Sequence, residues 1–530
     1  MPYTGHTITI PAGLGGLVFD RNPDQVPITH LTEARNVVID RGAWRKAPGA
    51  ATFGSAITGA PAIRAILDWR PTSAVQKLLV YAGDGTVYKD DGAGDLDAVT
   101  LVSGLSTTAR GQWVTAGAEA AGNARKAVLF TGADQPQVLA GDGATMAAVT
   151  EPAADWATDK PVGGVVHQGR LVAFAGHRIY LSSATDHEKF VTGGLQFAIF
   201  PGVGERVQAA VTFQGRLYLW KYPQGIFWLD DSDVNSANWA IRPLSFALGC
   251  APSPKAVLPM ANDVLFWSAD GRLHLLSAVQ ETAGEGVGTS DLSGALALQQ
   301  FLAETVALGA LSQMDAVWYG AEQTACFALP RFGTSLNTVL LLLNFEGRAR
   351  NEGVKPTWLD FARVEALALR KEADQVERPL FGDHQGVVRK LFQAARSVDG
   401  VGYVGQYATP DTDFGFADAS LGPKRKNFDA LEVVSLSTGA WTATVEVWID
   451  GRRTQTLQFG QGSGGAVLGS TFVLGTAVLG AAGVAQRRRR LTGNGRRLRL
   501  VGANAAAGED FWIAGHRVSF RVAGEEERAD

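Results

Sequence analysis

The densest charged feature of this sequence is a run of four arginines, Arg487, Arg488, Arg489 and Arg490. Guanidinium groups bind phosphate and carboxylate oxygens through paired hydrogen bonds, so the run could contact nucleic-acid phosphates or the carboxylates of a neighbouring subunit. The whole chain has a net charge of −4, and three glutamates stand at residues 525–527 of the same region. These charges favour salt bridges, solvated or between subunits, over a nucleic-acid surface.

Paired carboxylates could hydrolyse a glycosidic bond if the fold held them about 5 to 9.5 Å apart. Asp84, Asp270 and Asp450 each precede a glycine, and Asp-Gly pairs are also preferred at two-residue hairpin turns. The stretch 268–272 has its glycine one place too early for the Ser-x-Asp-x-Gly-x-Thr-Trp turn of sialidase-type propellers. We therefore expect hairpin turns, with a carbohydrate-binding or glycoside-cleaving protein as the alternative function.

Metal and nucleophile chemistry has little support in the sequence. The eight histidines have no carboxylate or cysteine at ligand spacing, and we interpret them as solvent-facing turn residues. Cys250 and Cys326 lack the paired spacing of a zinc or redox site, so we expect buried free thiols. The motifs of phosphate-binding loops, metalloprotease helices and nucleophile elbows are absent from the sequence. The sequence predicts a protein that is not an enzyme and needs no cofactor or metal.

Composition is typical of a globular, β-rich chain. Of 530 residues, 46% are hydrophobic, 19% are charged and 63 are glycine, which fits short strands joined by tight turns. The first residues show no secretion signal, so we expect synthesis and assembly in a reducing cytoplasm. Residues 464–485 are uncharged and precede the four arginines, as a membrane span would. Their six glycines predict strands and loops instead, and no stable membrane association.

Pairs of apolar strands joined by a turn recur roughly every 45–50 residues, which is the period of a four-stranded propeller blade. Clear copies are residues 78–88, 169–181 and 215–229. A single hairpin cannot bury both of its faces, so blades stacked around an axis are the natural solution. The sequence therefore predicts an all-β chain with a β-propeller of six or seven blades over residues 56–405.

Two regions depart from this period. Residues 282–311 predict a helical insertion, in which Ser290 or Asp291 caps a helix with Leu298 and Phe301 on its apolar face. The insertion either packs on a blade or forms a subunit contact. Residues 406–530 alternate apolar and polar positions and predict an antiparallel β-sandwich. Residues 1–55 remain as a separate N-terminal assembly segment.

The N-terminal segment carries the most distinctive pattern. It reads Gly13-Leu14-Gly15-Gly16-Leu17, then Leu31-Thr32-Glu33-Ala34-Arg35-Asn36-Val37, then Gly42, Arg45 and Pro48-Gly49. It resembles the opening of tail nozzle proteins (tail tubular B-like, or tail-hub, proteins) of short-tailed, podovirus-type bacteriophages. In that family a Gly-Leu start leads to Leu-x-x-Ala-x-Asn-Val, a glycine turn and Arg-x-x-Gly. Residues 409–415, followed by 424–426, are similar to the sandwich region of such proteins.

The resemblance implies a structural protein of the virion tail, assembled in the host cytoplasm as a homohexamer around a central channel. Portal-adaptor (head-to-tail connector) proteins and tail fibres or spikes would be its partners, and double-stranded DNA would be retained and ejected through it. Because phosphates held by Lys or Arg add affinity, a channel in which DNA slides should present acidic loops. The candidate lining residues are Asp84, Asp90, Asp91, Asp95, Asp230, Asp231 and Asp233. The alternative is that they are hydrophilic turns on the outside.

Overall fold

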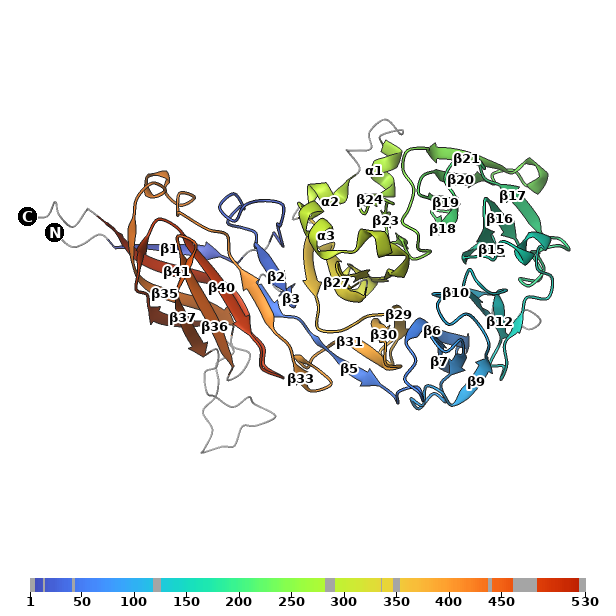
Figure 1. Cartoon of the computed structure of the whole chain (residues 1–530), viewed down its shortest axis with the longest axis horizontal. Helices are drawn as coiled ribbons and strands as arrows, with labels where there is room; N and C mark the ends of the chain where they lie inside the picture. Colours follow the sequence, from blue (N-terminus) through green and yellow to red (C-terminus); the bar gives the residue numbers. More distant parts are fainter. Residues whose placement is uncertain are drawn as a thin grey trace, which may run out of the picture.

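The computed structural model describes residues 5–12, 15–40, 43–117, 125–281, 291–334, 336–346, 353–436, 441–460 and 484–523. Figure 1 shows two bodies arranged along the long axis. One is a ring of small β-sheets and the other is a body of two larger sheets that contains β1, β35, β36 and β41.

The ring is a β-propeller. The first two blades are β6 (Ile63–Thr72), β7 (Val75–Ala82), β8 (Val87–Lys89) and β9 (Val99–Val102), then β10 (Gln112–Ala116), β11 (Lys126–Phe130), β12 (Gln137–Ala140) and β13 (Ala147–Ala148). The third and fourth blades are β14 (Gly163–His167), β15 (Arg170–Ala175), β16 (Arg178–Leu181) and β17 (Leu195–Ala198), then β18 (Arg206–Phe213), β19 (Arg216–Tyr222), β20 (Ile226–Asp230) and β21 (Ala240–Ser245). The remaining blades are β22 (Val257–Pro259), β23 (Val264–Trp267) and β24 (Leu273–Leu275); β25 (Asp315–Tyr319), β26 (Thr324–Pro330), β27 (Asn337–Asn344) and β28 (Lys355–Leu359); and β29 (Ala366–Lys371), β30 (Glu377–Gly382), β31 (Val388–Gln393) and β5 (Gly49–Phe53). The first strand of each blade contacts the first strand of the next, and β29 contacts β6, which closes the ring.

This arrangement confirms the predicted propeller. Six blades have four strands each in the described part of the chain, and the blade β22–β24 has three. The second strands of the third and fourth blades, β15 and β19, are buried along nearly their whole length because blades cover them on both faces. Two-residue turns lead into both strands, with Gln168-Gly169 and Gln214-Gly215 at positive φ, as a type I′ hairpin requires.

An N-terminal strand completes the last blade. β5 pairs with β31 and is the outermost strand of this blade, with Ala51 opposite Lys390. Two short strands, β32 (Ser397–Val398) and β33 (Val401–Gly402), extend the same sheet. A strand that precedes the propeller in the sequence and strands at its C-terminal end therefore share one sheet. Pairing between these strands closes the ring.

The predicted insertion is helical, but it is broken into short pieces. The helices are α1 (Leu276–Glu281), α2 (Leu292–Ala295) and α3 (Gln299–Thr305), followed by the 3-10 helix η3 (Leu308–Gln313). The remaining 3-10 helices are η1 (Ala154–Ala157), η2 (Ser236–Asn238), η4 (Gly320–Glu322) and η6 (Ala419–Leu421). Asp291 caps α2 by accepting a hydrogen bond from the Gly294 N–H, as predicted. Ala297 has a φ of +52°, which ends that helix before α3 begins.

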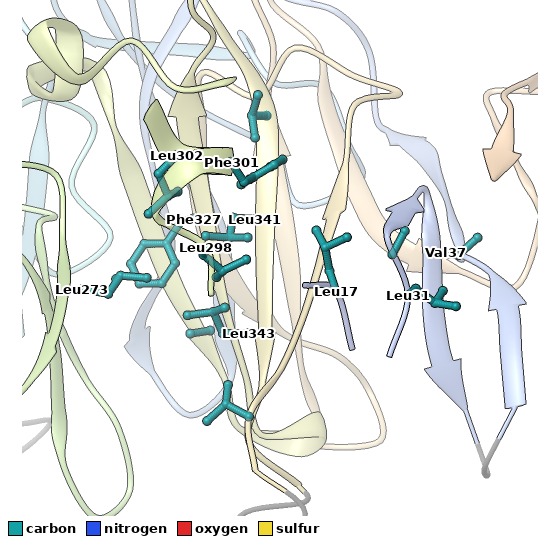
Figure 2. Close-up of a cluster of buried hydrophobic side chains, with 14 of the residues drawn as sticks. Leu17, Leu31, Val37, Leu273, Leu298, Phe301, Leu302, Phe327, Leu341 and Leu343 are labelled. Carbon is teal, nitrogen blue, oxygen red and sulfur yellow. The ribbon is translucent and has the colours of Figure 1, made fainter. Parts of the chain in front are cut away.

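The insertion packs on its own propeller. Leu298, Phe301 and Leu302 are at most 2% exposed. Figure 2 shows these three side chains in one buried cluster with Phe327 and Leu341, which lie on β26 and β27. The apolar face of the insertion is therefore covered within the chain, which favours the first of the two predicted roles.

The second body is a β-sandwich. One sheet contains β1 (His6–Pro11), β3 (Val37–Asp40), β4 (Ala43–Lys46), β35 (Lys426–Leu436), β38 (Val484–Arg490), β39 (Asn494–Gly495) and β41 (Trp512–Val522). The other contains β2 (Glu33–Arg35), β34 (Gly405–Ala408), β40 (Leu498–Asn504), β36 (Thr442–Ile449) and β37 (Arg452–Gly460). Buried Leu431 and Val518 of the first sheet and Val445 and Leu500 of the second belong to one core. Asp450 and Gly451 have positive φ at the β36–β37 turn, which confirms the predicted hairpin.

Residues 5–55 have no sheet of their own among the described residues. β1, β3 and β4 belong to one sheet of the sandwich, β2 to the other, and β5 to the propeller. Among the described residues there is no helix long and apolar enough to cross a membrane. Residues 461–483, which hold nearly all of the uncharged stretch predicted as strands and loops, lie outside the described part of the chain.

Candidate functional site: the interdomain junction and the arginine edge

The motif Leu31-x-x-Ala34-x-Asn36-Val37 lies where the sandwich meets the propeller. β2 stands between β28, the last strand of a propeller blade, and β34 of the sandwich. Arg35 pairs with Trp358 of β28, so a single sheet continues from the blade into the sandwich. Leu31, Ala34 and Val37 are at most 1% exposed, because they fill the core on the buried side of this strand.

Asn36 ties the two bodies together with its side chain. Its amide nitrogen donates to Asp360 Oδ1 and to the Val404 carbonyl, both at 2.8 Å, and its amide oxygen accepts from the Asp360 N–H at 2.8 Å. Asn36 is 1% exposed and has a φ of +51°, a conformation that asparagine tolerates better than most residues. The residue therefore meets both the backbone and the hydrogen-bonding demands of this position.

Asp360 is the anionic centre of the junction. Its side chain is 5% exposed and lies 2.7 Å from Arg35 and 3.8 Å from Arg331. Two arginines and the amide of Asn36 thus surround one buried carboxylate. Its negative charge is compensated by Arg35 from the N-terminal region and by Arg331 from the propeller.

A second polar cluster lies beside the start of β5. Lys46 is fully buried, and its Nζ donates to the Ala506 carbonyl at 2.8 Å and to Asn504 Oδ1 at 3.2 Å. Burial lowers the pKa of Lys46 to about 8. Arg45 and Arg396 both pair with Asp510, at 2.6 and 3.1 Å. These contacts connect β4, the end of the propeller and the loop before β41.

A cavity of about 650 Å³ opens next to this cluster. Its charged lining residues are Arg45, Glu322, Glu346, Lys355 and Arg396. Both signs of charge face the space, together with apolar groups such as Ile39 and Phe392. Such a mixture of charges and apolar groups is typical of a polar gap between two packed bodies. A site that selects a charged ligand would carry mainly one sign of charge.

The first group of predicted acidic residues builds loops of the blade β6–β9. Asp84 accepts from the Thr86 N–H and the Tyr88 hydroxyl, and Asp91 accepts from the N–H groups of Ala93, Gly94 and Asp95. Asp95 accepts from the Ser55 hydroxyl. Asp90 is buried, accepts from the Leu78 N–H, and has a pKa raised by burial.

The second group follows β20 in the fourth blade. Asp230 pairs with Arg242 at 3.3 Å, and Asp233 accepts from Asn235 and Asn238. Asp231 Oδ2 lies 2.5 Å from His167 Nε2 of the preceding blade. The first group lies in loops of the first blade, while Asp230 ends β20 of the fourth blade and Asp231 and Asp233 follow it. The two groups are therefore on different blades, and Asp231 reaches the end of the first strand β14 through His167.

Arg487, Arg488, Arg489 and Arg490 lie on β38, an edge strand of the sandwich. All four side chains are exposed. The Nε groups of Arg487 and Arg489 donate to the carbonyls of Gly460 and Gln458 on β37, while Arg488 pairs in register with Glu432 of β35. The glutamates at residues 525–527, which could face these arginines, lie outside the described residues.

The interpretation of the histidines as solvent-facing is wrong for four of them. His167, His187, His274 and His516 are at most 3% exposed. His167 is held between blades by Asp231 and by Thr212, whose hydroxyl lies 3.2 Å from His167 Nδ1. The sequence signal for this network is the Gln-Gly-Arg turn that His167 and Phe213 each precede, which marks equivalent places in two blades.

In the described part of the chain, no three His, Cys, Asp or Glu residues are grouped to hold a metal ion. Cys250 and Cys326 are buried free thiols, as predicted, and burial raises the pKa of both. What the described polar residues do is fasten strands, blades and the two bodies to one another.

Comparison with protein-family models and with curated proteins gives no match. Among solved structures, the chain is similar to the computationally designed Ika8 protein, with a TM-score of 0.37 and 11% identity over 65% of this chain and 99% of that chain. It is similar to BamB from Moraxella catarrhalis, with a TM-score of 0.36 and 12% identity over 68% and 96% of the two chains. It is also similar to BBS1N in complex with ARL6DN, with a TM-score of 0.40 and 12% identity over 64% and 94%. At these scores the likenesses carry no argument about function.

Proposed function

We propose that this chain is a structural, non-enzymatic protein of a short phage tail. Six copies form a ring-shaped nozzle or hub, which is attached to the portal-adaptor complex and contacts tail fibres or spikes. Double-stranded DNA is held behind this ring in the virion and leaves through its channel during ejection.

The observation that carries the proposal is the position of the N-terminal motif. The residues that resemble the nozzle family are those that join propeller and sandwich: Leu31, Ala34 and Val37 are buried, and Asn36 bonds to Asp360 and Val404. A sequence signature in a structural protein should mark residues that set the architecture. The motif residues have that role here.

The proposal also constrains the channel. The seven candidate aspartates lie on two blades and Asp90 is buried, so the other six line a DNA channel only if these parts of the blades face the axis of the hexamer. The axis of a single propeller is a different axis, around which its first strands contact one another. A ring whose channel lies between subunits is the arrangement that fits the proposed passage of DNA.

The mass of the purified protein, measured alone and after mixing with the adaptor protein, tests the proposal. Six copies per particle in either sample is the expected result. A strict monomer in both samples would contradict it, and would favour the alternative of a carbohydrate-binding or glycoside-cleaving propeller. Binding of surface glycans by that monomer would then be measured directly.

A further inference from the structure

One surface of the sandwich is basic to an unusual degree. Residues 451–500 contain nine arginines and no lysine, aspartate or glutamate. Six of them lie on β37 and β38, the edge strands of the two sheets, and Arg496 and Arg497 lie beside the β36–β37 turn, where their N–H groups donate to Asp450. We call this surface the arginine edge. Its members are Arg452, Arg453, Arg487, Arg488, Arg489, Arg490, Arg496 and Arg497, all of them exposed.

Two arginines of the edge form ion pairs with described carboxylates of the same chain. Arg453 pairs with Glu446 at 2.8 Å and Arg497 pairs with Asp24 at 3.0 Å. Arg452, Arg488 and Arg490 make no ion pair with any described residue. Edge strands often carry charge to prevent unwanted pairing, but one or two charges suffice for that. Arg488 stands in register with Glu432 of β35, so the edge has carboxylates nearby, but its eight guanidinium groups outnumber them and are suited to bind an anionic surface.

The propeller supplies such a surface. Residues 56–405 contain 28 Lys and Arg against 35 Asp and Glu, a net charge of −7. The other 180 residues contain 20 against 17, a net charge of +3. The two bodies lie at opposite ends of the long axis (Figure 1). Each molecule therefore presents a basic side at one end and an acidic body at the other.

Four aspartates lie in two loops of the blade β6–β9: Asp84 between β7 and β8, and Asp91, Asp95 and Asp97 between β8 and β9. The first three side chains are exposed. Backbone N–H groups of Ala93 and Thr58 lower the pKa values of Asp91 and Asp97, which keeps both carboxylates charged at neutral pH.

We propose that the arginine edge of one molecule docks on these acidic loops of a second copy of the same chain. The inference rests on the proposed ring and says which surfaces close it. A sandwich of one subunit against a propeller of the next is a head-to-tail contact, and such contacts generate rings when the rotation closes. Nucleic acid is the less favoured occupant, because the acidic propeller of the same molecule repels a polyanion.

Reciprocal charge reversal tests the contact. Variant one is Arg488→Glu with Arg490→Glu, and variant two is Asp84→Lys with Asp95→Lys. Each alone brings like charges together at every contact, so particle mass should drop from six copies to one. In an equimolar mixture, a ring in which the two variants alternate has opposite charges at every contact, and six-copy particles should return. A control with the same charge change elsewhere, Arg206→Glu with Arg216→Glu on the fourth blade, should assemble as the wild type does.

The outcomes separate this inference from the proposed function. If the wild type is monomeric, the proposed ring is wrong. If the wild type forms rings and variant one does so equally well, the ring stands and this contact is wrong. A labelled 20-base-pair DNA duplex serves as the competing ligand. If variant one keeps its rings but loses binding of that duplex, the arginine edge is a nucleic-acid surface and the inference is overturned.

Discussion

At the scale of single residues, this protein depends on polar side chains placed in tightly packed surroundings. Asn36, Lys46 and Asp360 are buried at the junction of the two bodies, and each finds its partners in a distant part of the sequence. A buried polar group that loses its partner costs more than an ordinary surface contact. These residues are therefore where single substitutions should have the largest effect on the joining of the two bodies.

Replacing Asn36 tests its role in the junction. Asn36→Gly keeps the positive φ accessible and removes the three side-chain hydrogen bonds, so the free energy of unfolding should fall by about 2–4 kcal/mol. Chemical denaturation measures this change. Asn22→Gly, at an exposed asparagine, should change stability by less than about 1 kcal/mol. Equal effects of the two substitutions would contradict the assigned role.

His516 should govern part of the acid sensitivity. Burial lowers its pKa to about 4, below the ordinary value of 6.5, so the unfolded chain takes up the proton first as pH falls. The neutral imidazole therefore contributes its full share of the unfolding free energy above pH 6.5, and this contribution is lost progressively as the pH falls to about 4. Relative to His516→Gln, the wild type should lose about 3 kcal/mol across this window. The control His384→Gln, at an exposed histidine, should leave the dependence of the unfolding free energy on pH as it is in the wild type. If His516→Gln showed the same pH dependence as the wild type, the role assigned to His516 would be wrong.

At the scale of elements, the critical pieces are short strands that pair across hundreds of residues. β5 completes the last blade, and β2 links a blade to the sandwich. β5 leaves little room for a larger residue at its first position, Gly49. A Cβ on Gly49 would stand 2.0 Å from the Ser397 carbonyl oxygen and 2.6 Å from that of Ala395, which are rigid backbone atoms.

Gly49→Ala should therefore weaken the pairing of β5 with β31, which closes the propeller ring. The backbone overlap should lower the unfolding free energy by about 2–4 kcal/mol, at the upper end of overpacking effects. Thermal melting and protease sensitivity of the last blade are the measurements. Gly202→Ala, where a Cβ meets nothing within 4 Å, is the matched control. A Gly49→Ala protein that melts with the control would show that β5 does not hold the ring closed.

The sequence predicted the elements that depend on local pattern. The recurring hairpins, the Asp450-Gly451 turn and the Asp291 cap are set by neighbours in the chain, and the structure confirms them. The distribution of β1–β5 over three sheets could not be predicted, because it depends on partners more than 300 residues away. The buried histidines were missed for a related reason: His167 is held by Asp231 and Thr212 of the next blade, 64 and 45 residues away, and the Gln-Gly-Arg turn that follows it does not by itself mark it as buried.

At the scale of the whole molecule, the chain is an acidic propeller joined to a sandwich with a basic edge. The joint is built from the motif that resembles the tail nozzle family, with Asn36 bonded to both bodies. This polarity is what a subunit of a head-to-tail ring requires, because each contact brings unlike surfaces together. Raising the salt concentration should weaken such a contact, since exposed charges are screened beyond about 8 Å at physiological ionic strength.

The ring itself is the central claim, and electron microscopy of the purified protein tests it most directly. Negatively stained particles, imaged alone and with the adaptor protein, are averaged without imposed symmetry. The account predicts round end views with six repeats around an open channel, each repeat showing a propeller and a sandwich. Averages that show only single two-bodied particles in both samples would contradict it.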